Sequence, residues 1–284
     1  MMKKCFLFAV LISGVLLSAC GGGGGGGTTN SSSSLSLAIT DAKPALPAGV
    51  DHVFVTIDEV SVHQSGGSWI SLSLAQTPFT IDLLQFTDGS TTQLVPQATL
   101  TPGKYTQVRL GVESALIITD TGEQIPVEIA SGDLKTDKNF DFEVTGGGAV
   151  ALTVDFDLSQ SLVVTGSSKY KLKPVLHIVT TTEAAALTGS IAAATYGPEN
   201  QATIIVTRDS DNSGNLTPGE EEYTRLVVAK GPSGPTPFSI YWLVPNQSYI
   251  VEVQIGGSTV YSQAVARTSL PIAVVYPLNS GNPI

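Results

Sequence analysis

The residues in this chain best suited to chemistry lie in one acidic stretch of twelve residues, from Asp209 to Glu220. Side chains that carry oxygen recur at alternate positions along it, and Gly214 stands sixth, where a tight loop has to turn sharply. Hard oxygen donors in this order can surround a single divalent cation. The candidate ligands are Asp209, Asp211, Ser213, Asn215, Thr217 and Glu220.

This order matches the calcium loop of an EF-hand position by position. Asp209, Asp211 and Ser213 fill positions one, three and five. Asn215 offers its backbone carbonyl at position seven, and Glu220 stands at position twelve, where a carboxylate binds the ion through both oxygens. We predict calcium as a structural cofactor, bound with a Kd of about 10⁻⁴ to 10⁻³ M. The alternative is an acidic surface loop that holds only water.

The segments that flank this stretch differ from those of a true EF-hand. Residues 202–207 and 223–228 are rich in β-branched side chains, so we expect the loop to join two strands rather than two helices. Leu216 at position eight is expected to be the apolar plug of the loop.

Paired carboxylates are a second possible source of chemistry. Asp155 and Asp157 could serve a hydrolase as acid and nucleophile. We favour a structural interpretation, in which they face a row of lysines on an adjacent antiparallel strand. That row comprises Lys169, Lys171 and Lys173.

Catalytic motifs are otherwise missing from the sequence, which has no GxSxG, HExxH, P-loop or dinucleotide-binding pattern. The histidines are interpreted as hydrogen-bonded or surface residues rather than as metal ligands or bases. They are His52, His63 and His177. We therefore predict that the protein is not an enzyme, with an Asp- or Glu-dependent hydrolase as a distant alternative.

Composition and periodicity predict the elements that position these residues. The net charge of −10 disfavours nucleic acid as a partner. From Leu35 onward apolar and polar residues alternate with period two between Gly-rich turns, a pattern typical of strands. We predict an all-β fold of two β-sandwiches, Ig-like or Greek-key in type, over residues 35–179 and 187–284.

Three local features of these strands can be checked against a structure. Val53, Val55 and Ile57 alternate up to a β-bulge expected at residues 58–59. Strands on either side of Pro245 are expected to form a hairpin. Trp242 is expected in the core of that domain, although with Tyr241 it could also form a platform for sugar stacking. Residues 180–186 are the expected connector between the domains.

The amino-terminal segment has the three parts of an export signal. Lys3 and Lys4 precede an apolar run, and the small residues Ser18 and Ala19 precede Cys20. This junction resembles the lipobox of bacterial lipoproteins, which implies that Cys20 becomes the lipidated first residue after cleavage. Residues 20–34 then form a flexible Gly- and Ser-rich tether. The expected location is the cell envelope, and the outer membrane in a two-membrane bacterium.

A resemblance to the DUF4382 domains of bacterial and archaeal lipoproteins extends over residues 35–179. The segments that carry it lie at residues 51–63, Trp69, 81–84, 102–109, 155–157 and 170–174. It implies a β fold and an envelope location but no activity. Residues 238–253 resemble the last hairpin of transthyretin-like, carboxypeptidase-regulatory-like and Cna-B modules, which serve as spacers and stalks.

These features together predict a non-catalytic, lipid-anchored envelope protein that acts as a surface binding or adhesion module with a structural calcium site. The alternative is a stalk or subunit of an envelope assembly. The expected partners are the membrane, through the lipid on Cys20, and a protein or glycan ligand of unknown identity.

Overall fold

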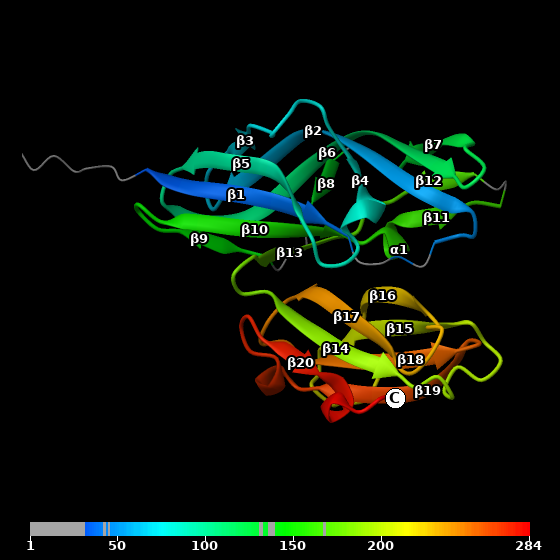
Figure 1. Cartoon of the computed structure of the whole chain (residues 1–284). Coiled ribbons are helices and arrows are strands. Elements are labelled where there is room, and N and C mark those ends of the chain that lie inside the picture. The colour runs from blue at the N-terminus through cyan, green and yellow to red at the C-terminus, as the bar shows by residue number, and fades with distance from the viewer. Residues whose placement is uncertain (1–31, 42–43, 45, 131–132, 136–139, 167–168) are drawn as a thin grey trace, which may run out of the picture. The chain divides into compact units, whose positions relative to one another are not determined.

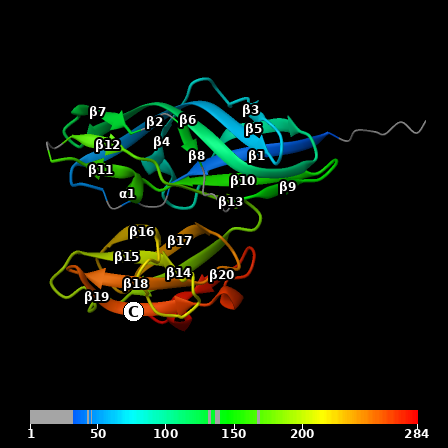
Figure 2. The ribbon, with the colours of Figure 1, turned by 180° about the vertical axis from the view of Figure 1, so that it is seen from behind.

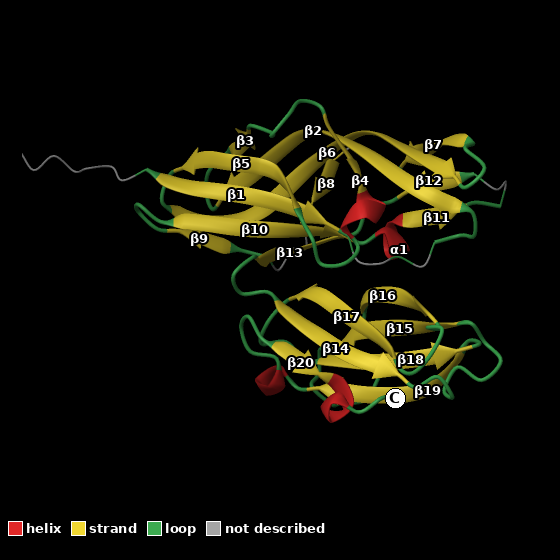
Figure 3. Cartoon of the chain, viewed as in Figure 1, coloured by secondary structure: helices red, strands yellow, loops and turns green. Residues whose placement is uncertain are grey.

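The structure is a computed structural model that describes residues 32–284 except 42–43, 45, 131–132, 136–139 and 167–168. The described chain is nearly all β, as predicted, and its helical segments are short (Figure 3). No described helix has the length and apolar character needed to cross a membrane. The predicted export signal, Cys20 and residues 20–31 of the predicted tether lie outside the described residues. Ser33 and Ser34 belong to the first strand, so the prediction that the tether extends to residue 34 is wrong.

The first half of the described chain forms two sheets that enclose one hydrophobic core (Figures 1 and 2). The smaller sheet has the strand order β13–β10–β1–β5, and the larger one β11–β12–β7–β6–β2–β3, with β4 paired to β2 and both β8 and β9 to β6. The strands of the smaller sheet are β1 (Ser33–Thr40), β5 (Thr92–Leu100), β10 (Ala149–Phe156) and β13 (Leu176–Thr180). The strands of the larger sheet are β2 (Val50–Gln64), β3 (Trp69–Leu72), β4 (Phe79–Asp82), β6 (Gly103–Thr119), β7 (Gln124–Ile129), β8 (Asp133–Lys135), β9 (Phe142–Val144), β11 (Leu162–Val164) and β12 (Tyr170–Leu172).

Alternation along β2 builds one wall of this core. Val53, Val55 and Ile57 are fully buried, while the residues between them face outward. The register of β2 against β6 shifts between Ile57 and Glu59, which confirms the predicted bulge. After the bulge the apolar face resumes, and Val60 is again fully buried.

The predicted pairing of an acidic strand with a lysine strand is wrong. β10 pairs in parallel with β1 and antiparallel with β13, so the register partner of Asp155 is His177. Lys171 lies on β12 and forms an ion pair with Glu128 of β7 at 2.9 Å. Because β10 is a central strand, its carboxyl-terminal half is buried on both faces, and Asp155 has no exposed lysine row opposite it.

The second half of the chain builds two further sheets around a separate hydrophobic core. Their orders are β17–β14–β20 and β16–β15–β18–β19. The strands are β14 (Ala185–Ile191), β15 (Gln201–Arg208), β16 (Glu222–Ala229), β17 (Thr236–Leu243), β18 (Tyr249–Ile255), β19 (Ser258–Val265) and β20 (Val275–Pro277). Residues Ser31–Ile284 form one compact unit, so the division into two domains at residues 180–186 stays a prediction.

The hairpin predicted around Pro245 is also wrong. β17 pairs with β14 and β18 pairs with β15, so the chain crosses from one sheet to the other at Pro245. Both strands alternate as expected, but alternation does not specify which neighbour a strand takes.

Four short helical segments complete the described fold, and two of them begin at an aspartate. Asp157 caps α1, where it accepts a hydrogen bond from the Gln160 backbone N–H, and Asp82 caps η1 through Leu84 N–H. The segments are α1 (Leu158–Ser161), η1 (Leu83–Phe86), η2 (Arg267–Ser269) and η3 (Leu278–Gly281).

Candidate metal centre

The acidic loop connects β15 to β16, which are hydrogen-bonded antiparallel neighbours. Arg208 N–H donates to Glu221 O at 3.1 Å, so the two ends of the loop are joined where β15 ends and β16 begins. Asp209 N–H donates to Ser248 O at 3.0 Å, which also fixes the start of the loop to the start of β18. In an EF-hand two helices position the calcium loop. Here the strands of the β sheet do so.

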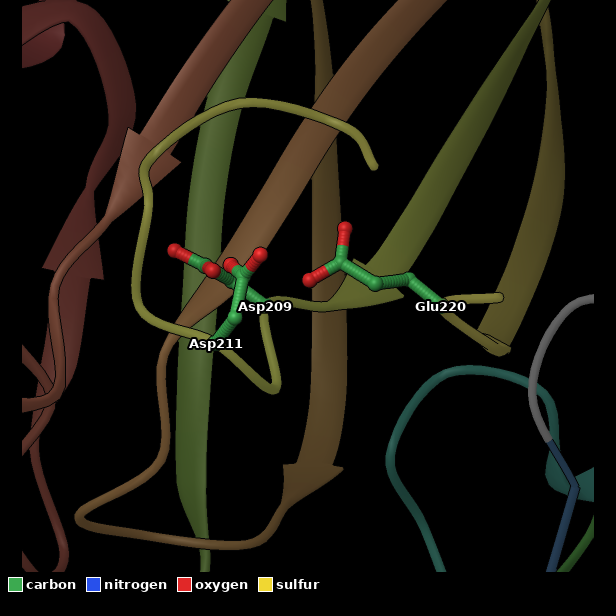
Figure 4. Close-up of side chains that lie close together, drawn as sticks. All are labelled: Asp209, Asp211 and Glu220. Carbon is green, nitrogen blue, oxygen red and sulfur yellow. The ribbon is translucent and has the colours of Figure 1, made fainter. Parts of the chain in front are cut away.

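Three carboxylates converge inside this loop. Each of Asp209, Asp211 and Glu220 offers an oxygen, and these oxygens lie within 4.8 Å of one another. Figure 4 shows the three side chains directed toward the same space. Asp209 is buried, with 6% of its surface exposed, whereas Asp211 is exposed. Oxygen ligands at such separations are what a hard cation requires, so this cluster could hold a metal ion.

Backbone amides of the turn hold the two aspartates. Ser213 N–H lies 2.9 Å from Asp209 Oδ1 and 2.9 Å from Asp211 Oδ1, and Gly214 N–H donates to Asp209 Oδ2 at 3.0 Å. Gly214 has a φ of +72°, a conformation that costs a glycine little. The hydrogen bonds from Ser213 are the main reason why the pKa of Asp211 is lowered below its usual value. The carboxylate is therefore charged at neutral pH.

Glu220 closes the loop from its other end. Its Oε1 accepts a hydrogen bond from Ser210 N–H at 2.9 Å, and its Oε2 accepts one from Thr217 N–H at 2.9 Å. The Thr217 hydroxyl donates to Asp211 Oδ2 at 3.2 Å. The predicted ligands at positions one, three, nine and twelve are thus brought together.

The remaining predicted ligands bond to each other. The Ser213 hydroxyl donates to Asn215 O at 2.9 Å, and Asn215 Nδ2 donates to Ser213 O at 3.1 Å. Leu216, expected to be the apolar plug, is 54% exposed, so that expectation is wrong. The physical reason is that the loop joins two strands, β15 and β16, rather than the two helices that enclose this side chain in an EF-hand.

Residues that lie outside the loop in the sequence anchor it, and the sequence did not predict them. The Ser248 hydroxyl donates to Asn212 Oδ1 at 2.7 Å and accepts a hydrogen bond from Arg267 N–H at 3.0 Å. A Cβ added at Gly214 would lie 3.6 Å from Ala264 Cβ on β19. No signal in the sequence links these positions to the loop, because the contacts join segments far apart in the chain.

Asp157, one of the two aspartates considered for hydrolysis, is bonded within the fold. Asp157 is fully buried, and its Oδ2 accepts a hydrogen bond from Gln160 Nε2 at 2.9 Å in addition to the helix-capping bond on Oδ1. Burial raises the pKa of Asp157 above its usual value, and the nearby Glu222 adds to the effect. Both oxygens of Asp157 are therefore engaged within the fold, as a structural role predicts.

The histidines are hydrogen-bonded or packed against rings. His52 Nδ1 lies 2.7 Å from Asp82 Oδ2, and His63 Nδ1 lies 3.1 Å from Thr106 Oγ1. The hydrogen bond with Asp82 is the main cause of a raised pKa at His52. The ring of His177 is stacked on that of Tyr223, with 4.1 Å between centroids.

Trp242 and Tyr241, predicted as a core residue and as part of an alternative platform for sugars, lie in different surroundings. Trp242 is half-buried rather than fully enclosed in the core. The Tyr241 ring lies directly over Gly89, where an added Cβ would come within 2.8 Å of it.

The fold and the loop define an all-β sandwich protein with an acidic, metal-compatible loop between two strands. The sequence matches the family described as "Domain of unknown function (DUF4382)" over residues 32–174, which is just over half of the chain. The chain therefore belongs to the DUF4382 family, and the predicted resemblance is confirmed. No curated protein matches the sequence.

Three solved structures show a distant likeness. The TIE protein of Bacillus anthracis is 10% identical, with a TM-score of 0.22 over 89% of this chain and 34% of its own, so the present chain spans about a third of it. A candidate cell adhesion protein from Bacteroides ovatus is 12% identical, with a TM-score of 0.21 over 87% of this chain and 90% of its own. The fimbrial anchor protein Mfa2 of Porphyromonas gingivalis is 9% identical, with a TM-score of 0.20 over 81% and 82%. At these values the likenesses carry no argument about function.

Proposed function

We propose that the protein is a non-catalytic, lipid-anchored module of the cell envelope that binds a surface ligand and is stiffened by calcium. The observation that carries the calcium part is the convergence of Asp209, Asp211 and Glu220 oxygens within 4.8 Å, in the order that an EF-hand loop requires. The anchor rests on the sequence around Cys20, which resembles a lipobox.

Calcium would be held by the three carboxylates, with Ser213, Asn215 and Thr217 completing the predicted set. The bound ion would offset the mutual repulsion of the carboxylates and supply a fixed centre for the loop. The loop is tied to β18 through Ser248, so the stiffening would reach two neighbouring strands as well. The role of the calcium ion would be structural rather than catalytic.

A thermal melt with added calcium tests the ion. A ligand that binds only the folded state stabilises it, by about 1.4 kcal/mol at ten times the Kd. For a chain of this size the expected rise in Tm is roughly 3 to 6 °C, reached at about 1 to 10 mM calcium. The same range of magnesium should raise Tm less, because magnesium demands a smaller and more regular octahedron. An unchanged Tm with calcium would contradict the proposal.

The envelope role needs a separate experiment. Cross-linking and pull-down from intact cells, with and without a calcium chelator, should recover a protein or glycan ligand. Recovery of identical copies or of a structural assembly would favour the alternative of a stalk or subunit instead.

The anchor is tested by replacing Cys20 with serine. Serine has no thiol to accept the acyl group, so the Cys20→Ser chain should leave the membrane fraction and lack acyl mass. The natural chain should stay in the membrane fraction with acyl chains on Cys20. A natural chain that is soluble and carries no acyl mass would remove the anchor from this account.

A further inference from the structure

A β-bulge near the end of β17 turns Trp242 out of the second hydrophobic core. Strict alternation would place Ile240 and Trp242 on the same face, but the core contains Ile240 and Leu243 instead. The register of β17 against β14 shifts between Ile240 and Leu243. Trp242 has a φ of +60°, a left-handed conformation that is unusual for a bulky side chain. Bulges and backbone strain of this kind re-aim side chains at functional sites.

The indole N–H of Trp242 is buried, and no protein atom accepts its hydrogen bond. Its Nε1 atom makes no hydrogen bond with any described residue. The carbonyl of the same residue is held in place, because the Tyr223 hydroxyl donates to Trp242 O at 3.1 Å. A buried indole N–H usually has an acceptor, and leaving it without one costs free energy. The strained backbone therefore holds a donor in a position where its acceptor has to come from outside the chain.

Trp242 lines a small polar cavity. The volume of this cavity is about 20 Å³, and a cavity needs about 10 to 15 Å³ to hold one water molecule. Asp41, Asp155 and Thr224 line it as well, and each of these residues is at most 2% exposed. Asp41 and Asp155 belong to the first half of the described chain, whereas Thr224 and Trp242 lie on β16 and β17 of the second half. The cavity is therefore shared by the two halves.

The lining of the cavity supplies both hydrogen-bond donors and acceptors. The Trp242 indole can only donate, and the carboxylates of Asp41 and Asp155 can only accept when they are charged. The Thr224 hydroxyl can do both. Its oxygen is buried without a hydrogen-bond partner, although it is close enough to Asp157 to offset part of the pKa rise that burial causes there. A small molecule that both donates and accepts therefore suits the cavity.

We propose that this cavity binds one water molecule, which accepts a hydrogen bond from Trp242 Nε1 and donates to the carboxylates of Asp41 and Asp155. Water fits because it is donor and acceptor at once, whereas dry cavities in proteins are lined by apolar groups. A metal cation fits less well, because the indole N–H directs the positive end of its dipole into the same space. The water bridges the two halves of the chain.

A water held in this way adds a polar contact between the two halves. Direct hydrogen bonds join the same halves: Gln160 Nε2 donates to Tyr223 O at 2.8 Å, and the Ser159 hydroxyl donates to Arg225 O at 3.1 Å. Moving either half would break the bonds of the water and leave Trp242 Nε1 buried without an acceptor. The bound water therefore favours one fixed arrangement of the two halves.

Nuclear magnetic resonance can detect this water in the chain from Ser31 to Ile284, which contains both hydrophobic cores within one compact unit. The sequence has two tryptophans, Trp69 and Trp242, so two indole N–H signals are expected, and Trp242→Phe assigns them. The Trp242 signal should show a cross-peak at the water frequency, with opposite signs in NOE and ROE spectra, as a bound water produces. Equal signs in both spectra would show exchange of the N–H with solvent and would overturn the proposal, as would the lack of a cross-peak.

Thr224→Val separates the water from the hydroxyl proton of Thr224, because valine has a similar shape but no hydroxyl. The cross-peak should persist in this variant if it arises from the water. Loss of the cross-peak would assign it to the hydroxyl proton and count against the proposal. Thr203→Val, at a half-buried position of β15 outside the cavity, is the matched control and should leave the cross-peak unchanged.

A crystal structure tests the position of the water. Electron density for one water molecule is expected about 2.7 to 3.2 Å from Trp242 Nε1. Oxygen neighbours at about 2.3 to 2.6 Å around the same density would identify a calcium ion instead. A calcium ion in this cavity, or a cavity without density, would overturn the proposal. None of these outcomes bears on calcium binding by the acidic loop, which the melting experiment tests separately.

Discussion

Two groups of carboxylates in this protein lie in opposite environments. Asp209, Asp211 and Glu220 gather in a loop that is largely exposed, and the hydrogen bonds they accept come from residues of the same loop. Asp155 and Asp157 lie at the end of a central strand and are buried. The pKa of Asp211 is lowered by hydrogen bonds from Ser213, whereas burial raises the pKa of Asp157.

The difference teaches what each group can do. A cluster that stays charged and reaches solvent can attract a cation, because the ion replaces water without opening the core. A buried carboxylate whose oxygens are already engaged can only stabilise the fold. Similar residue types thus predict a binding site in one region and a structural cap in the other.

The largest expected effect comes from removing the buried cap. Asp157→Ala leaves the Gln160 N–H without its acceptor and removes one of the two acceptors of the Gln160 side-chain amide, so we expect a loss of about 2 kcal/mol in the free energy of unfolding. Urea denaturation measures it, and the loss should be the same with and without calcium. The control Asp120→Ala, at an exposed position, should change stability by less than about 0.5 kcal/mol. If the loss in the free energy of unfolding of Asp157→Ala depended on calcium, the buried and the exposed carboxylates would not have separate roles.

The next effect concerns the loop. Glu220→Gln keeps one of the two hydrogen-bond acceptors but removes the charge and the bidentate ligand, so the stabilisation by calcium, about 1.4 kcal/mol at ten times the Kd, should disappear. Calcium titration followed by Tm or calorimetry measures it. Glu221→Gln, the adjacent exposed carboxylate, is the matched control and should respond to calcium as the natural chain does. Equal losses in both variants would point to nonspecific ion binding.

Ionisation of the two groups should also change the stability of the fold in opposite directions. The pKa of Asp157 is raised in the folded state above its usual 3.8, so the folded chain should lose stability as the pH rises from 3.8 through that raised pKa. The pKa of Asp211 is lowered, so its contribution is present above 3.8 and is lost as the pH falls through the lowered value. Acid unfolding of Asp157→Asn and Asp211→Asn, each compared with the natural chain, separates the two. The same sign in both variants would contradict the assignment.

The smallest effect is expected at a carboxylate outside both groups, Asp82, which bonds to His52 near the surface. The pKa of His52 is raised above 6.5, chiefly by this hydrogen bond. Its contribution is complete below pH 6.5 and is lost as the pH rises through the raised value. His52→Gln should therefore narrow the gap in Tm between pH 6 and pH 8. An unchanged gap would show that the ion pair adds nothing to stability.

Some features followed from the sequence because they depend on neighbouring residues. The period of two predicts strands whatever their partners, and the bulge after Ile57 interrupts that period in the sequence itself. The spacing from Asp209 to Glu220 brings its ends together because one short loop carries all the donors. The residues in such contacts are close together in the chain, so the local order of the sequence is enough to predict them.

Other features were decided only by the tertiary structure. Alternation assigns a face to each residue but no neighbour to each strand, so β10 pairs with β13 rather than with the lysine strand, and β17 and β18 separate into two sheets. The burial of Asp157 and the anchoring of the loop by Ser248 depend on contacts across long stretches of chain. Packing of the whole chain selects these contacts, because the hydrophobic faces of all the strands must be buried together.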